Sequence, residues 1–159
     1  MLKILSLDPS GTGTTGICLI NGSKITFQEF KHKDWSEHLT HLGSLILTFD
    51  PTLLLYENTN YINSRGKDMT SLFRLMGAIE SLPLKKASIL VHQIKDLKAK
   101  LLAGTKQIKG LTCQPGRGKG WIFKSQRISL HQLDAFLVYW LWKERQRTCF
   151  ESSGKEKNA

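Results

Sequence analysis

Hydrophobic and polar positions divide the first third of the chain into three short strands, before a helix and a fourth strand. Residues 2–8, 15–20 and 25–30 have strand patterns, and Asn21-Gly22 is typical of a tight turn between the second and third. Residues 35–49 have apolar side chains at helical spacing, and Asp50-Pro51 ends that helix. Residues 53–57 are almost all apolar, as in a central strand covered on both faces.

The second half of the chain predicts two further helices, one more strand and a last helix. Asp68 is expected to cap a helix that ends near Pro83 and has these residues facing inward: Met69, Leu72, Phe73, Leu75, Met76 and Ile79. Residues 88–92 predict a strand, 94–103 a basic helix and 128–145 the last helix, whereas the glycine-rich, basic stretch 105–124 predicts a mobile loop. This order indicates an α/β fold with a mixed five-stranded sheet, three antiparallel strands followed by two parallel ones, and helices on both faces.

Composition is typical of one intracellular domain. With 159 residues and 40% hydrophobic content, we expect a single domain over residues 1–147 and a polar, flexible tail over 148–159. Three widely spaced cysteines suggest a reducing compartment, and no signal-like segment or membrane-spanning apolar run is visible, so we expect a cytoplasmic protein.

The net charge of +10 is concentrated in less than a quarter of the chain. Residues 93–127 contain nine Lys or Arg residues and one acidic residue, Asp96. This distribution predicts a surface that binds a polyanion such as nucleic acid. A solvated loop with no such role is the alternative.

Three carboxylates and an imidazole are attached to apolar, core-forming segments. Asp8 and Glu57 each end a strand, and His131 and Asp134 share one side of the last helix. Buried acids need a compensating cation, and acids on neighbouring strands about 4.8 Å apart can share a metal ion. Two metal ions about 4 Å apart hydrolyse phosphodiesters. In the alternative interpretation, Asp8 caps a turn, Glu57 is a surface acid and Asp134 pairs with Lys or Arg.

Other motifs are weaker. Residues 11–16 match the dinucleotide pattern G-x-G-x-x-G, but a strand follows where that motif requires a helix. Gly118-Lys119 lacks the remaining P-loop residues. The resemblance of residues 8–15 to the phosphate loop of actin-like sugar kinases would require a second domain. His38 and His41 are expected on a solvated helix face, and Trp140 and Trp142 in the core or a subunit contact.

Four motifs in series resemble the RuvC family of Holliday-junction resolvases over about residues 2–145. They are a strand ending in Asp8-Pro9-Ser10, a strand ending in Glu57-Asn58, Gln93-Ile94-Lys95 at the start of a basic helix, and the segment 131–135. The resemblance implies a ribonuclease H-like fold with two Mg²⁺ ions, for which Mn²⁺ could substitute. Asp8 would bridge the ions, Glu57 would complete one site, and His131 with Asp134 would complete the other.

The resemblance also implies roles for basic and aromatic residues. Lys95, together with Lys119 on the glycine-rich loop, would hold the scissile phosphate or offset charge building on it, and Tyr61 would insert into the junction centre. The full set expected to contact DNA is Tyr61, Arg65, Lys95, Lys98, Arg117, Lys119 and Lys124. Ser10 and His131 differ from the residues usual in cellular members, which favours a phage or mobile-element type.

The expected function is a Mg²⁺-dependent endonuclease that cuts four-way or branched DNA and leaves a 5′-phosphate and a 3′-hydroxyl. A homodimer with the helix over residues 69–79 at its seam would match the symmetry of such a junction, and no nucleotide cofactor or membrane is expected. The alternatives are another ribonuclease H-like nuclease, acting on hybrid RNA or as a recombination nickase, and a non-catalytic nucleic-acid-binding module.

Overall fold

The main sheet has the predicted mixed topology. The computed structural model describes residues 2–59, 67–114 and 120–155, apart from the side chains of Lys67 and residues 150–155. Its five-stranded sheet has the order β3-β2-β1-β4-β5, with the bounds β1 Lys3–Asp8, β2 Thr14–Asn21, β3 Lys24–Lys31, β4 Leu53–Asn58 and β5 Lys86–Leu90. The first three strands pair antiparallel, and β4 and β5 extend the sheet in parallel.

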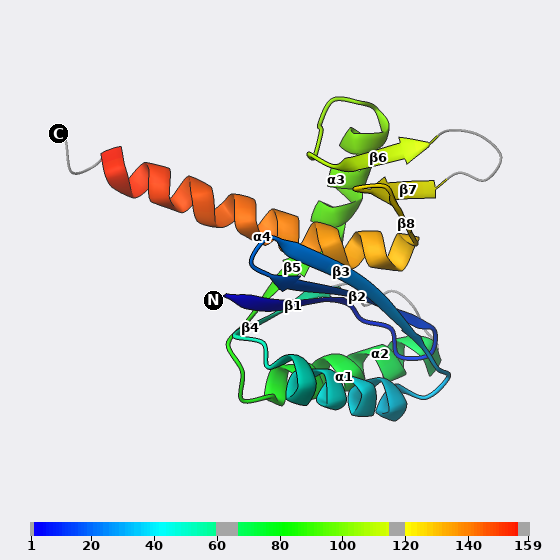
Figure 1. Cartoon of the computed structure of the whole chain (residues 1–159). Coiled ribbons are helices and arrows are strands. Elements are labelled where there is room, and N and C mark those ends of the chain that lie inside the picture. Colours follow the sequence, from blue (N-terminus) through cyan, green and yellow to red (C-terminus); the bar gives the residue numbers. More distant parts are fainter. Residues whose placement is uncertain (1, 60–66, 115–119, 156–159) are drawn as a thin grey trace.

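Helices cover both faces of this sheet. Helices α1 (Trp35–Phe49) and α2 (Lys67–Ser81) lie on one face, and α4 (Leu130–Lys155) crosses the other, with α3 (Val91–Leu102) beside it (Figure 1). Alternate residues of β1 divide between two cores because strand side chains alternate. Leu5 and Leu7 pack with α1 and α2, whereas Ile4 packs with α4. Ser6 Oγ donates a 2.7 Å hydrogen bond to the carbonyl oxygen of Ala135, which fastens α4 to the sheet.

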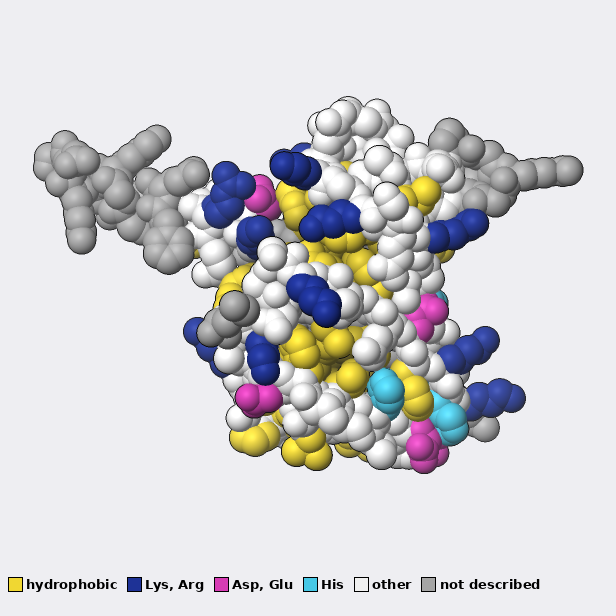
Figure 2. All heavy atoms as spheres, in the orientation of Figure 1, with side chains coloured by type: hydrophobic (Ala, Val, Ile, Leu, Met, Phe, Trp, Pro, Cys, Tyr) yellow, Lys and Arg dark blue, Asp and Glu magenta, His cyan; other side chains and the backbone are white. Residues whose placement is uncertain are grey.

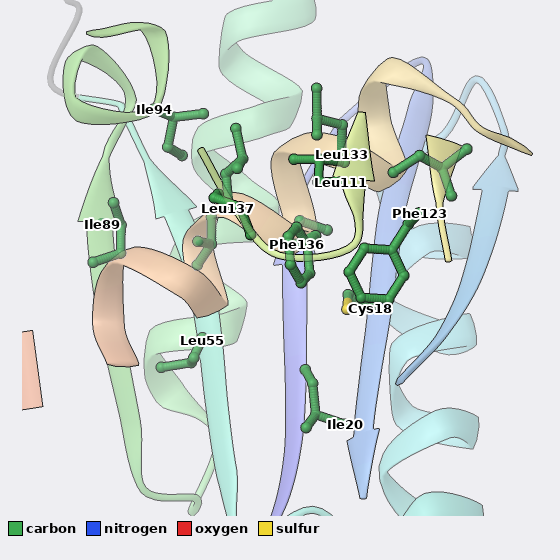
Figure 3. Packing of buried hydrophobic residues seen from close by; sticks show 14 of the residues in the cluster. Cys18, Ile20, Leu55, Ile89, Ile94, Leu111, Phe123, Leu133, Phe136 and Leu137 are labelled. Atoms are coloured by element: carbon green, nitrogen blue, oxygen red, sulfur yellow. The ribbon is translucent and has the colours of Figure 1, made fainter. Parts of the chain in front are cut away.

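A second, smaller sheet corrects the predicted loop over residues 105–124. It consists of β6 (Leu111–Gln114), β7 (Gly120–Phe123) and β8 (Gln126–Ile128), paired antiparallel. Trp121 and Phe123 are buried, two residues apart on one face, and Phe123 lies 4.9 Å from Phe136 between ring centroids. Figure 3 shows Phe136 of α4 among core side chains from both sheets. The small sheet is therefore part of the core on the α4 face.

Several predicted boundaries and orientations were wrong. The last helix runs over residues 130–155 instead of 128–145, and its second half extends past the edge of the main sheet (Figure 1). Asp68 lies inside α2, so it is not the cap, and its Oδ1 accepts a 2.9 Å hydrogen bond from Thr12. Phe73 was expected to face inward but is 44% exposed.

Basic side chains occur over much of the surface. On the face shown in Figure 2, Lys and Arg side chains are spread across the molecule, and acidic ones are fewer. Among the residues described, no helix combines the length and apolar character needed to span a membrane.

Candidate active site

Strand alternation and register bring Asp8 and Glu57 to one edge and one face of the sheet. Asp8 follows Ile4 and Ser6 at two-residue intervals on the α4 face, and Glu57 follows Leu53 and Leu55 in the same way. The parallel register pairs the residue before Asp8 with the residue before Glu57, so the two acids occupy equivalent positions at neighbouring strand ends. The predicted proximity of these acids follows directly from this register.

The first turn of α4 completes the site. Ser129 and Gln132 form a capping box: Ser129 N donates to Gln132 Oε1 over 2.9 Å, and Gln132 N donates to Ser129 Oγ over 3.1 Å. This Ser-x-x-Gln signal fixes the start of the helix at residue 130, whereas the apolar pattern predicts residue 128. His131 then lies in the first turn, with Nδ1 3.0 Å from Oδ2 of Asp8.

Gly16 permits this close approach of helix and sheet. It pairs with Asp8 across β1 and β2, and a Cβ atom at Gly16 would lie 1.9 Å from the carbonyl oxygen of His131. Any side chain here would therefore displace the start of α4. In the sequence, Gly16 stands out only as the third glycine of a rejected dinucleotide motif. Its role as a positioning residue depends on a contact with a segment more than a hundred residues away.

The loop after Asp8 is held by its own hydrogen bonds and by α2. Ser10 N donates to Thr15 Oγ1 over 3.0 Å, and a Cβ atom at Gly11 would lie 2.3 Å from the backbone nitrogen of Leu72. The loop therefore packs directly against the backbone of α2. This contact constrains the backbone on the C-terminal side of Asp8.

The prediction of a solvated face for His38 and His41 was wrong. His38 is 3% exposed, its Nδ1 lies 2.8 Å from Thr15 Oγ1, and its Nε2 lies 3.0 Å from the carbonyl oxygen of His32. His41 is half-buried and stacks on Phe30 with 4.3 Å between ring centroids. His38 supports the loop after Asp8 through Thr15, and this hydrogen-bond partner in β2 explains why a polar ring is buried there.

The three acids of the site act on one another electrostatically. Burial, followed by the charges of Asp8 and Asp134, raises the pKa of Glu57 from 4.5 to about 8. Burial also raises the pKa of Asp8, against the lowering effect of its hydrogen bond to His131. That same hydrogen bond raises the pKa of His131, the largest cause of its shift. The site therefore favours any arrangement that adds positive charge among these groups.

Asp134 pairs with a residue that was predicted to contact DNA. Lys98 Nζ lies 2.8 Å from Oδ1 and 2.9 Å from Oδ2 of Asp134, and only the Oδ2 contact has hydrogen-bond geometry. Asp134 thus follows the alternative in which it pairs with a lysine. Within the described ranges, no three His, Cys, Asp or Glu side chains are close enough together to coordinate one ion in this arrangement.

An open pocket of about 400 Å³ is lined in part by Asp8, Glu57, Lys95 and His131. Lys95 is exposed on α3, so its ammonium group is accessible to a ligand in the pocket. Lys124 is exposed in the tight β7–β8 turn, where its φ is 45°. The remaining predicted DNA contacts lie outside the described residues: Tyr61, Arg65, Arg117 and Lys119.

Solved structures with a similar fold include resolvases. Thermus thermophilus RuvC in complex with a Holliday junction substrate matches with a TM-score of 0.54 and 12% identity, over 87% of this chain and 90% of that one. A second T. thermophilus RuvC structure matches with a TM-score of 0.50 and 16% identity, over 86% and 90% of the two chains. YeaZ from Pseudomonas aeruginosa gives 0.42 and 10%, over 80% and 64%. No protein-family model matches the sequence, and no curated protein is significantly similar to it.

The fold is therefore ribonuclease H-like, as predicted, and matches that of RuvC. Because the sequence identities are low, this similarity establishes the fold of the chain alone. One fold can support many functions, and the function has to be argued from the site.

Proposed function

We propose that this protein is a metal-dependent endonuclease that cuts four-way or branched DNA. The observation that supports the proposal is the position of three acids, Asp8, Glu57 and Asp134, whose charges act on one another at one edge of a ribonuclease H-like sheet. His131 lies within hydrogen-bond distance of Asp8 at the same edge. Burial, followed by the charges of Asp8 and Asp134, raises the pKa of Glu57 to about 8. Carboxylates brought together at this cost are typical of a site that binds cations.

The donor set fits Mg²⁺ in its chemistry. Carboxylate oxygens are the ligands that Mg²⁺ prefers, and an imidazole also accommodates Mn²⁺. Oδ1 of Asp134 is buried 2.8 Å from Lys98 Nζ without hydrogen-bond geometry, so a divalent cation there would compete with that ammonium group. Asp8 would be shared between two ions, with Glu57 at one and His131 and Asp134 at the other. Bound ions would activate water and stabilise charge on the phosphate.

The protein's own residues would bind and orient the substrate. Lys95 reaches the pocket from α3 and would hold the scissile phosphate. Water would form a bond to phosphorus as the bond to O3′ breaks, and O3′ would leave with a proton. The products would be a 5′-phosphate and a 3′-hydroxyl.

A homodimer would match the two-fold symmetry of a four-way junction. The segment of α2 over residues 69–79 is the proposed seam, supported by the exposure of Phe73 on that helix. Two copies of the site would then act on two equivalent strands.

The deciding experiment is cleavage of a synthetic four-way junction with Mg²⁺ or EDTA, beside duplex, flap and RNA–DNA hybrid substrates. We expect Asp8→Asn to abolish cleavage while junction binding persists. Asp50→Asn is the matched control, because Asp50 is exposed at the opposite end of the sheet and asparagine tolerates its φ of 52°. Cleavage by Asp8→Asn in Mg²⁺ would exclude Asp8 from the mechanism, and preference for the hybrid would favour a different nuclease.

One observation favours a non-catalytic nucleic-acid-binding module as the second candidate. The pairs His131–Asp8 and Lys98–Asp134 already provide local charge compensation for two of the acids. Such a module would bind junction DNA with the same affinity in EDTA and Mg²⁺, and it would not cleave any of the four substrates.

A further inference from the structure

Lys98 occupies an unusual position for a surface lysine. It projects from α3 to Asp134 on α4, and its side chain is 25% exposed, against 17% for Asp134. Both carboxylate oxygens of Asp134 lie within 3 Å of the ammonium nitrogen, at 2.8 and 2.9 Å. A lysine that only solvated the surface would extend into water, so this contact is a specific part of the site.

The charge of Lys98 acts on the whole group of acids. It lowers the pKa of Asp8 and of Glu57, although burial and the neighbouring carboxylates outweigh that effect. The ammonium group therefore provides positive charge among the same acids that would bind the metal ions. A divalent ion held by Asp134 would compete with it for the same oxygen atoms.

We propose that the Lys98 ammonium takes the place of the second divalent cation in the DNA-free protein. This inference rests on the proposed endonuclease function and specifies how its site is loaded. In the free protein, one ion binds at Asp8 and Glu57, and Lys98 competes with the second at Asp134. A DNA phosphate gives Lys98 another partner, and its flexible stem allows the exchange without movement of α3.

This arrangement makes loading of the second site depend on substrate. Removal of the partner of a buried charge is costly, so Asp134 retains Lys98 until another cation replaces it. DNA supplies an anion for the lysine, and the second divalent ion can then bind Asp134. The protein would hold its complete metal set mainly when DNA is bound.

The test is a titration of the metal-free, DNA-free protein with Mn²⁺, measured by isothermal titration calorimetry. We expect the wild type to bind one Mn²⁺ ion tightly and a second one weakly. Lys98→Met should bind both, with the second ion bound at least about ten-fold more tightly than in the wild type, or ~1.4 kcal/mol. Lys100→Met is the matched control on the same helix, because its side chain is exposed, and it should behave as the wild type.

The melting temperature provides a second measurement, which also shows whether each variant folds. Lys98→Met should lower the melting temperature in EDTA, and Mn²⁺ should raise it by more than in the wild type. Lys98→Gln, which retains a hydrogen-bond donor, replaces Lys98→Met if that variant does not fold. Equal Mn²⁺ stoichiometry and affinity in the wild type and the Lys98 variant would overturn the role of Lys98 and leave the endonuclease intact. Failure of both proteins to bind Mn²⁺ would overturn the metal-dependent function itself.

Discussion

Replacement of Glu57 by glutamine should stabilise the metal-free protein, although it removes a proposed metal ligand. Glutamine has nearly the shape of the protonated acid and cannot ionise. In the unfolded chain Glu57 has a pKa near 4.5, whereas in the fold it holds its proton up to about 8. A carboxyl with a raised folded-state pKa takes up a proton on folding between these values, so stability falls as pH rises through that window.

The size of the effect follows from this window. Above the ordinary pKa of 4.5, each pH unit lowers the unfolding free energy of the wild type by about 1.36 kcal/mol, so the loss at pH 7 is ~3 kcal/mol. Partial contact with solvent screens the carboxyl, so we expect a gain of about 2 kcal/mol for Glu57→Gln, or about 4–8 °C in Tm for a chain of this size. The gain should disappear below the ordinary pKa and reach its maximum above pH 8.

The assay is urea denaturation in EDTA at about pH 4, about pH 7 and about pH 8.5, which bracket the window. Glu80→Gln provides the matched control, because it makes the same chemical change at an exposed position on α2. Addition of Mg²⁺ should stabilise the wild type more than Glu57→Gln. A variant no more stable than the wild type at pH 7, with a difference that does not change with pH, would refute the electrostatic account of the site.

Two further predictions concern the supports of the site. Gly16→Ala should lower the unfolding free energy by about 1–3 kcal/mol and reduce cleavage, because the added methyl group meets the backbone of His131. The control Gly43→Ala has open space around it and should stabilise α1 by up to ~1 kcal/mol. Equal unfolding free energies for both variants would contradict the contact at Gly16. Lys124→Gln should reduce the slope of log affinity against log salt concentration by about 0.9, the value for one phosphate contact. Lys24→Gln, at an exposed position at the far end of β3, should leave the slope unchanged. An unaltered slope for Lys124→Gln would show that Lys124 does not contact a phosphate.

The strand ends could be predicted because their signal is local. Asp8 and Glu57 each follow a run that is apolar apart from Ser6, and strand alternation alone decides which face each acid shares with its neighbours. The order of strands and helices follows from the same local patterns, which explains why the sheet was predicted correctly.

The partners of these acids could not be predicted because they depend on packing between distant segments. Lys98 and Asp134 are 36 positions apart and meet only where α3 lies beside α4. His38 is buried because Thr15 provides a hydrogen-bond partner in a neighbouring strand. In both cases, the sequence gives the residue type but not the neighbour that determines its role.

The small sheet was missed for a different reason. Its strands are three or four residues long, so each has room for only one or two alternations of buried and exposed side chains. The glycine and lysine content of the surrounding segment indicated a loop more strongly than this short alternation indicated strands. Packing of Phe123 against Phe136 of α4, and against Phe27 far earlier in the chain, provides the stabilisation that local propensity does not.

The two-residue alternation in β1 and β4 also restricts which insertions and deletions the lineage of this protein can tolerate. Loss or gain of one residue inside either strand, upstream of its acid, would turn that carboxylate toward α1 and α2, away from His131. An insertion or deletion of two residues would keep the carboxylate on the same face of the sheet and change only its position along the strand. Relatives that retain these acids should therefore vary in length within their loops and at the far ends of their helices, and rarely by single residues within the two central strands.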